Sequence, residues 1–279
     1  MYNINCKGKL LSFDEPLLMG IINATPDSFF HGHLTDGPGA ILALAGKMIN
    51  EGVDILDIGG QSTRPGSERI PVDTELERVI PVIKNIHGHY PQAIISIDTY
   101  SSIVAKASVE AGASIVNDIS AGNLDKDMLA TVASLQIPYI CMHMKGTPAD
   151  MQRDPVYTDV VKEVLDFFIA KTDECTKAGI TDIIIDPGFG FGKTIQHNFQ
   201  LLKELGALSI TGKPILTGLS RKSTICRTLG IKAEEALNGT TVMNTMALIN
   251  GASMLRVHDV KEAKEVIRLF TAYKKTPRQ

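Results

Sequence analysis

Short runs of apolar residues recur along the chain and alternate with amphipathic stretches. The runs are almost continuously apolar, which is typical of parallel strands buried on both faces. The first run starts at residue 17 and the eighth at residue 253, so each unit has about 34 residues, enough for one strand and one helix. The eight predicted strands are Leu17–Ile22, Val53–Ile58, Ala93–Ile97, Ser114–Val116, Pro138–Met142, Asp182–Ile185, Pro214–Thr217 and Ser253–Val257.

Helices are predicted between these strands because apolar residues there recur at positions i, i+3, i+4 and i+7. Pro81 should kink one helix, and Asp259 is a candidate N-cap of another. A hairpin is predicted over Tyr2–Phe13, so the pattern favours one (β/α)8 barrel spanning residues 1–279, preceded by a β-hairpin, over a doubly wound sheet. The apolar helix positions include Ile41, Leu44, Ala45 and Met48; Leu76, Val79, Ile80 and Ile83; and Ala263, Val266, Ile267 and Phe270.

The composition narrows the functional class. The 279 residues are 44% hydrophobic and carry a net charge of -3, which argues against disorder and against a nucleic-acid binder. No apolar run approaches the length of a membrane span, and the start of the chain does not resemble a signal peptide. The cysteines form no Cys-x-x-Cys pair, so neither a disulfide framework nor a zinc site is expected. We expect buried or partly buried thiols in a reducing cytoplasm at Cys6, Cys141, Cys175 and Cys226.

Polar residues stand where the predicted strands end, and in such barrels this end carries the active site. The anionic members are Asp57, Asp98 and Asp186, which suit a ligand rich in N–H donors or a developing positive charge. The cationic members suit phosphate oxygens. We therefore predict a pocket divided between an amine-rich ring and a phosphate. The cationic and neutral members are Arg64, Lys222, Arg256 and His258, with Asn23, Asn117, Met142, His143 and Ser220.

Three of these loops are rich in glycine, over residues 59–66, 186–194 and 217–223. The second ends like a phosphate-binding P-loop, but Pro187 stands where its first glycine is required. Lys193 likewise replaces the third glycine of a Gly-x-Gly-x-x-Gly motif, so both nucleotide motifs fail on spacing. Sharp turns and close approach of the backbone to a ligand explain these glycines better.

Seven segments in register resemble dihydropteroate synthase, and the resemblance runs from about Met19 to His258. The family has a (β/α)8 fold and is usually dimeric. The resemblance implies the synthesis of 7,8-dihydropteroate and pyrophosphate from 6-hydroxymethyl-7,8-dihydropterin diphosphate and p-aminobenzoate, with Mg²⁺, in folate biosynthesis, and a target for sulfonamides. The segments are Gly20–Phe29, Gly60–Gly66, Ser96–Thr99, Val116–Ile119, Asp186–Lys193, Leu219–Ser223 and Leu255–Asp259.

The resemblance also implies the site, with Asp98, Asp186 and Lys222 as the catalytic residues. It places the pterin against these three with Asn117, Ile119, Met142, Phe191 and Gly218, and the diphosphate against Asn23, Arg64, Arg256 and His258, with Asn23 near the Mg²⁺. It places p-aminobenzoate by Phe29, Thr63, Arg64, Pro65, Ser220 and Lys222. An SN1-like reaction follows, in which Asp98 and Asp186 stabilise a cation while Arg256, His258 and Mg²⁺ stabilise the leaving pyrophosphate.

One departure from the family stands in the first loop, where His31 replaces the usual acidic residue. Two alternatives remain beside the synthase. A pterin-dependent methyltransferase would share the pterin-reading residues but needs neither the 220–222 run nor a diphosphate site at Arg256 and His258. A non-catalytic paralogue is favoured only by His31.

Several residues have structural interpretations beside functional ones. Asp27 is a turn or helix cap, and Lys193 closes a loop or caps a helix rather than touching substrate. Arg221 forms a salt bridge beside the more important Lys222. For Asp57 and Asp118 the structural and functional interpretations are balanced.

Overall fold

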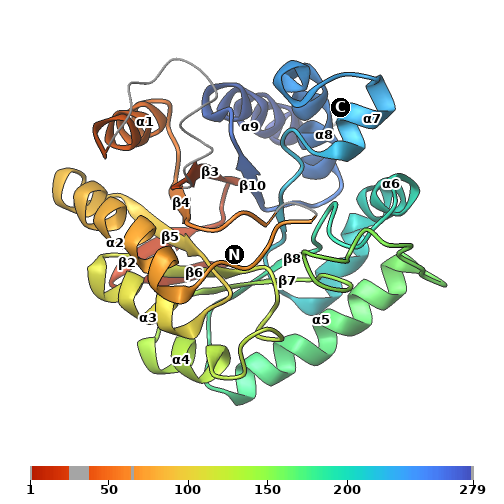
Figure 1. Cartoon of the computed structure of the whole chain (residues 1–279). Helices are drawn as coiled ribbons and strands as arrows, with labels where there is room; N and C mark the ends of the chain where they lie inside the picture. Colours follow the sequence, from red (N-terminus) through yellow and green to blue (C-terminus); the bar gives the residue numbers. More distant parts are fainter. Residues whose placement is uncertain (1, 25–37, 64–65, 278–279) are drawn as a thin grey trace.

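Eight parallel strands form the centre of the molecule in the computed structural model, which describes residues 2–24, 38–63 and 66–277 (Figure 1). Neighbours in the sheet follow the order β8-β7-β6-β5-β4-β3-β10-β9. Its two edges meet at a parallel bridge between Ile185 and Ile215, which closes the barrel. All eight predicted runs contain a strand: β3 Leu17–Asn23, β4 Ile55–Gly59, β5 Ile94–Asp98, β6 Ile115–Asp118, β7 Tyr139–Met142, β8 Ile183–Asp186, β9 Leu216–Thr217 and β10 Met254–Val257.

Two apolar clusters explain why the strands are apolar on both faces. Side chains alternate across a strand, so successive residues such as Leu18 and Met19 enter different clusters. The larger cluster lies between strands and helices. The smaller one fills the barrel with Leu17, Met19, Ile55, Ile94, Ile115, Ile140, Ile184, Leu216 and Met254.

Helices surround the sheet (Figure 1). α2 is one continuous helix that contains Pro81. Asp259 is the N-cap residue of α9, as predicted, but its side chain makes no cap hydrogen bond and its carboxylate accepts from Arg221 instead. The helices are α1 Pro38–Asn50, α2 Val72–His89, α3 Ser102–Ala111, α4 Met128–Leu135, α5 Val160–Lys177, α6 Ile195–Lys203, α7 Ser223–Leu229, α8 Leu237–Ile249 and α9 Val260–Lys275.

The predicted hairpin is present and closes the amino end of the barrel. β1 (Asn3–Cys6) pairs antiparallel with β2 (Lys9–Ser12) through a turn in which Lys7 and Gly8 both have positive φ, as a two-residue hairpin turn requires. Ile4 and Cys6 are buried in the smaller cluster, against strand residues such as Met19. This end is therefore packed, and the opposite end is left for a site.

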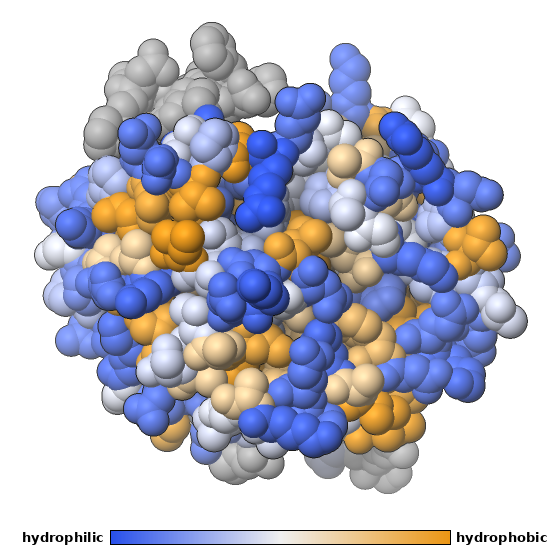
Figure 2. Space-filling view, turned by 60° about the horizontal axis from the view of Figure 1, so that its bottom comes forward, coloured by the Kyte–Doolittle hydropathy of each residue, from blue (hydrophilic) through white to orange (hydrophobic). Residues whose placement is uncertain are grey.

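Hydrophilic side chains cover much of the face shown in Figure 2, with smaller hydrophobic patches between them. None of the helices in the described ranges is both long and apolar enough to cross a membrane. The thiols of Cys6, Cys141 and Cys175 are buried and that of Cys226 is half-buried, as expected.

Candidate active site

The carboxyl ends of the strands bring the predicted polar residues to one end of the barrel. Strand register sets Asn23 beside Gly59, Gly59 beside Asp98, and Asp98 beside Asn117. Met142 is likewise level with Asp186 on the neighbouring strands β7 and β8. Because these strands are parallel and in register, residues far apart in sequence form one ring.

The centre of the ring is a partly buried cluster of ion pairs around Arg256, on β10. Its Nε donates to Asp57 Oδ2 and its Nη2 donates to Asp98 Oδ2, both at 2.6 Å. Asn117 Nδ2 also donates to Asp57 Oδ2, at 3.0 Å. The predicted division into an anionic and a cationic half is therefore wrong at Arg256, because its guanidinium lies between two carboxylates and the fully buried Asp57 needs a cation close by.

Burial shifts the pKa values in this cluster. It raises the pKa of Asp98 to about 7, an effect that Arg256 opposes and Asp57 reinforces. Burial would lower the pKa of Arg256, but the charges of Asp57 and Asp98 outweigh it and the pKa is raised. Arg256 is therefore always a cation, whereas Asp98 changes its charge near neutral pH.

Lys222 and Asp186 form the next part of the site. Lys222 Nζ donates to the Phe189 carbonyl at 2.6 Å and lies 4.2 Å from the centre of the Phe191 ring. Burial lowers the pKa of Lys222 to about 8, while Asp186 opposes that shift. Asp186 accepts a hydrogen bond from Gly188 N at 2.8 Å, and burial raises the pKa of its carboxyl. The Phe189 carbonyl is a contact that no side-chain motif could predict.

Lys193 closes the loop that carries these groups, as predicted. Its buried Nζ donates to the carbonyls of Gly188 (3.0 Å) and Phe191 (3.1 Å) and to His143 Nδ1 (2.9 Å). Burial lowers the pKa of His143 to about 2 and that of Lys193 to about 7. His143 is thus a neutral acceptor, and Lys193 anchors the loop to the end of β7.

Ser220 and His258 lie together, although the resemblance placed them at different parts of the substrates. Ser220 Oγ and His258 Nδ1 are 3.0 Å apart, and His258 N donates to Ser220 Oγ at 3.3 Å. The next residue, Arg221, pairs with Asp259 at 2.5 Å, which confirms its predicted salt bridge. Arg221 is therefore held by Asp259, whereas its neighbour Lys222 lies against the Phe189 carbonyl.

An apolar cluster borders the polar ring. Ile119 and Met142, both predicted to pack against the pterin, are buried together with Tyr100, and Phe191 packs partly buried against them. Tyr100 was missed by the sequence, although it stands only two residues after Asp98 and its hydroxyl accepts from Gln61. Gly218 follows β9 and has open space where a Cβ would stand.

The other predicted residues lie at the rim of the site, outside the described residues, or in a structural role. Asn23 is exposed at the end of β3 and Thr63 is half-buried after β4. Phe29, Arg64 and Pro65 lie outside the described residues, as do His31 and Asp27. Asp118 is buried and accepts from Ser120, Gly122 and Tyr139, all 2.7 Å away, so its structural interpretation is confirmed.

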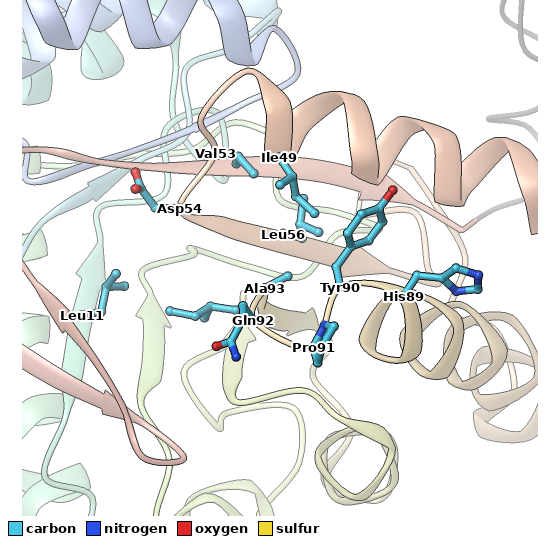
Figure 3. A pocket seen from close by; sticks show the side chains of 11 residues that line it. Leu11, Ile49, Val53, Asp54, Leu56, His89, Tyr90, Pro91, Gln92 and Ala93 are labelled. Carbon is cyan, nitrogen blue, oxygen red and sulfur yellow. The ribbon is translucent and has the colours of Figure 1, made fainter.

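A pocket of about 500 Å³ lies beside the barrel, near the amino ends of β4 and β5, and none of the predicted site residues lines it (Figure 3). Its walls are mainly apolar and come from the ends of α1 and α2 and from the hairpin, with Ile49, Tyr90 and Leu11 among them. Its carboxylate, Asp54, accepts from Leu18 N at 2.7 Å and lies 3.6 Å from Lys264 Nζ.

Comparison with known proteins identifies the family. Residues 19–258 match the family described as pterin binding enzyme. The chain is 40% identical over 268 residues to the dihydropteroate synthase of Escherichia coli strain K12, covering 95% of this chain and 94% of the relative. The chain belongs to the dihydropteroate synthases.

Solved structures agree with this family. The dihydropteroate synthase of Xanthomonas albilineans with 4-aminobenzoic acid is 40% identical, covers 99% of both chains and has a TM-score of 0.92. The same organism's enzyme in complex with 7,8-dihydropteroate is 37% identical with a TM-score of 0.88, covering 99% of this chain and 100% of that one. These matches favour the synthase over the methyltransferase.

Proposed function

We propose that the condensation catalysed by this enzyme, of 6-hydroxymethyl-7,8-dihydropterin diphosphate with p-aminobenzoate to give 7,8-dihydropteroate and pyrophosphate, follows an SN1-like course. The observation that carries this proposal is the cluster of Asp98, Asp57 and Arg256 at the carboxyl end of the barrel. It sets carboxylates beside a guanidinium, as the separation of a cation from a leaving anion requires. Known relatives solved with 4-aminobenzoic acid and with 7,8-dihydropteroate support the substrate classes.

The pterin is held by groups that pair with its polar edge. Asn117, Asp98 and Asp186 supply acceptors for its N–H groups, and Lys222 supplies a donor. Ile119, Met142 and Phe191 give its faces an apolar environment, since the first two are buried in one cluster and Phe191 packs against it. Gly218 leaves room for the ring to approach the backbone.

The reaction begins as the C–O bond to the diphosphate lengthens and positive charge develops on the pterin methylene. Asp98 and Asp186 stabilise that charge when they are ionised. Arg256 uses Nε and Nη2 for Asp57 and Asp98, so within the described residues its Nη1 remains for a phosphate oxygen. His258 and Arg64 are the further diphosphate ligands that we propose.

The donor set near the diphosphate fits Mg²⁺. Asn23 offers an amide oxygen at the end of β3, and Mg²⁺ usually takes only one or two protein ligands together with substrate phosphates. When bound, the ion would neutralise negative charge on the departing pyrophosphate.

The p-aminobenzoate amine then attacks the methylene and loses a proton. We propose Thr63, Ser220 and Lys222 as its binding residues, together with Phe29, Arg64 and Pro65, which lie outside the described residues. The aryl amine is itself the nucleophile, so the proposal needs no activated serine or cysteine.

Positional isotope exchange tests this course. The pterin diphosphate is labelled with ¹⁸O at the bridge between the methylene and the phosphate, and it is incubated with enzyme and Mg²⁺ without p-aminobenzoate. Scrambling of the label into non-bridging positions is expected, because the bond breaks before the amine arrives. Where pyrophosphate can rotate in the site, unscrambled label with normal turnover once p-aminobenzoate is added contradicts the SN1-like course. Pyrophosphate release that never depends on p-aminobenzoate contradicts the synthase function.

We also propose a homodimer in the cytoplasm. Exposed apolar side chains on α8, Val242, Met246 and Ile249, recur at i, i+4 and i+7 and support a second copy of the chain against that helix. The free thiols suit a reducing compartment. Sedimentation of the wild-type chain and Met246→Glu tests the dimer: the variant should sediment as a monomer.

A further inference from the structure

Asp57 lies beneath the candidate site and joins three strands. Its side chain is 0% exposed, and its Oδ2 accepts both from Arg256 Nε at 2.6 Å and from Asn117 Nδ2 at 3.0 Å. The second oxygen, Oδ1, is buried with no hydrogen-bond partner among the described residues. Asp57 is thus too deep to reach a substrate, but it touches two residues that we place in the site.

The bond to Asn117 fixes the orientation of an asymmetric group. An amide side chain has a donor end and an acceptor end, whereas a carboxylate only accepts. Turned the other way, Asn117 would set its oxygen against the Asp57 oxygen, with two acceptors in contact. Asn117 Oδ1 therefore faces away from Asp57. It makes no hydrogen bond within the described part of the chain, and it is not fully buried.

We propose that Asp57 is a positioning residue for pterin recognition, because it turns the carbonyl oxygen of Asn117 toward the substrate as an acceptor for a ring N–H. The inference deepens the proposed function and rests on it for the identity of the ring. A ring that presents an N–H at this position gains a hydrogen bond. A ring that presents only an acceptor there is rejected, because two buried acceptors would face each other unpaired.

The test compares Asp57→Leu with Asp57→Asn. Leucine removes both acceptors, so the Asn117 amide is free to rotate. Asparagine keeps one oxygen that can take the place of Oδ2 with its amide nitrogen at the unpartnered position, so it preserves the orientation without the charge. The probe is 6-hydroxymethyl-7,8-dihydropterin without its diphosphate, titrated calorimetrically, so that the contact between Asp57 and Arg256 does not enter through phosphate binding.

We expect Asp57→Leu to weaken binding of the dihydropterin about tenfold or more, the scale of one lost oriented hydrogen bond. Asp57→Asn should stay within about threefold of wild type. The KM for p-aminobenzoate should change little in either variant. Equal losses in the two variants would show that charge, not orientation, matters, and wild-type binding by Asp57→Leu would show a structural role alone; either result overturns the proposal.

Asp118→Asn is the matched control, since Asp118 is another buried aspartate whose partners, Ser120, Gly122 and Tyr139, we do not place in the site. It should lower the midpoint of thermal unfolding without changing dihydropterin binding. If Asp57→Leu does not fold, Asp57→Ser replaces it, because its hydroxyl is one bond too short to reach Asn117.

A double-mutant cycle with Asn117→Leu separates direct from indirect action. If Asp57 acts through Asn117, adding Asp57→Leu (or Asp57→Ser) to Asn117→Leu should cost no further dihydropterin affinity. Additive losses overturn the proposal. The probe measures binding alone, so these outcomes stay distinct from a failure of the condensation itself.

Discussion

Lys222 and Lys193 show how neighbours give one residue type two roles. Lys193 is buried and Lys222 is half-buried, both near Asp186, and desolvation lowers the pKa of both. Lys193 donates hydrogen bonds to two loop carbonyls and to His143. Among the described residues Lys222 donates to one carbonyl, so its other N–H groups can donate to a ligand. The loop-closing role predicted for Lys193 is confirmed by these bonds, and the substrate contact predicted for Lys222 stays a prediction.

Lys222→Ala should therefore cost far more activity than Lys193→Ala. We expect kcat/KM to fall about 100-fold for Lys222→Ala, the scale of a lost charge contact at a reacting centre, and less than tenfold for Lys193→Ala. Pyrophosphate release with saturating Mg²⁺ measures both, at a temperature where circular dichroism shows both variants folded. Equal effects would contradict the site described above.

The pH dependence follows from Asp98 and Lys222. The pKa of Asp98 is raised to about 7, so its anion forms only above that pH. The pKa of Lys222 is lowered to about 8, so its cation is lost above that pH. We expect kcat/KM to rise through about pH 7 and to fall above about pH 8. Lys222→Ala should lose the alkaline fall, and a flat wild-type profile between pH 6 and 9 would contradict the assignment.

At the scale of elements, the loop between β8 and α6 forms one wall of the site. Asp186, the Phe189 carbonyl and the Phe191 ring all come from this segment, and Lys193 holds it to the end of β7. Gly188 permits the fit, since it has a φ of +67° and a Cβ there would overlap the His143 carbonyl. Sequence predicted a sharp turn here but not the close contact.

Gly188→Ala should destabilise the fold and the site together. Gly212→Ala is the matched control, because Gly212 has a φ of +66° and nothing near a Cβ. Positive φ should lower the free energy of unfolding by about 1 kcal/mol in both variants. Gly188→Ala adds the overlap with the His143 carbonyl, so its free energy of unfolding should fall by at least about 2 kcal/mol. Urea unfolding measures the difference. Equal losses of stability in the two variants would contradict the close contact between Gly188 and the His143 carbonyl.

At the scale of the molecule, the hairpin and the site occupy opposite ends of the barrel. Ile4 from β1 is fully buried with Met19, Ile55 and other inward strand residues. Helix-facing and barrel-facing cores are thus separate, and loops at the carboxyl end can change without disturbing the packed amino end.

Ile4→Ala should lower stability but leave the chemistry intact. Removing a buried isoleucine side chain beyond Cβ costs about 2–5 kcal/mol, whereas Leu10→Ala, at a side chain 71% exposed, should change stability by less than about 0.5 kcal/mol. Thermal unfolding measures stability and pyrophosphate release measures kcat at 25 °C. A large drop in kcat for folded Ile4→Ala would contradict the separation of the two ends.

The sequence alone determined the eight strand–helix units, the hairpin and the ring of polar strand ends, because these depend on local periodicity and on where each apolar run stops. Arg256 and Asp57 stand 199 residues apart, and no local pattern pairs them. Strand order and register bring their side chains within 2.6 Å, and burial then makes the ion pair obligatory. Only the tertiary structure could decide that the cation lies among the aspartates, and that Asp57 accepts a hydrogen bond from Asn117.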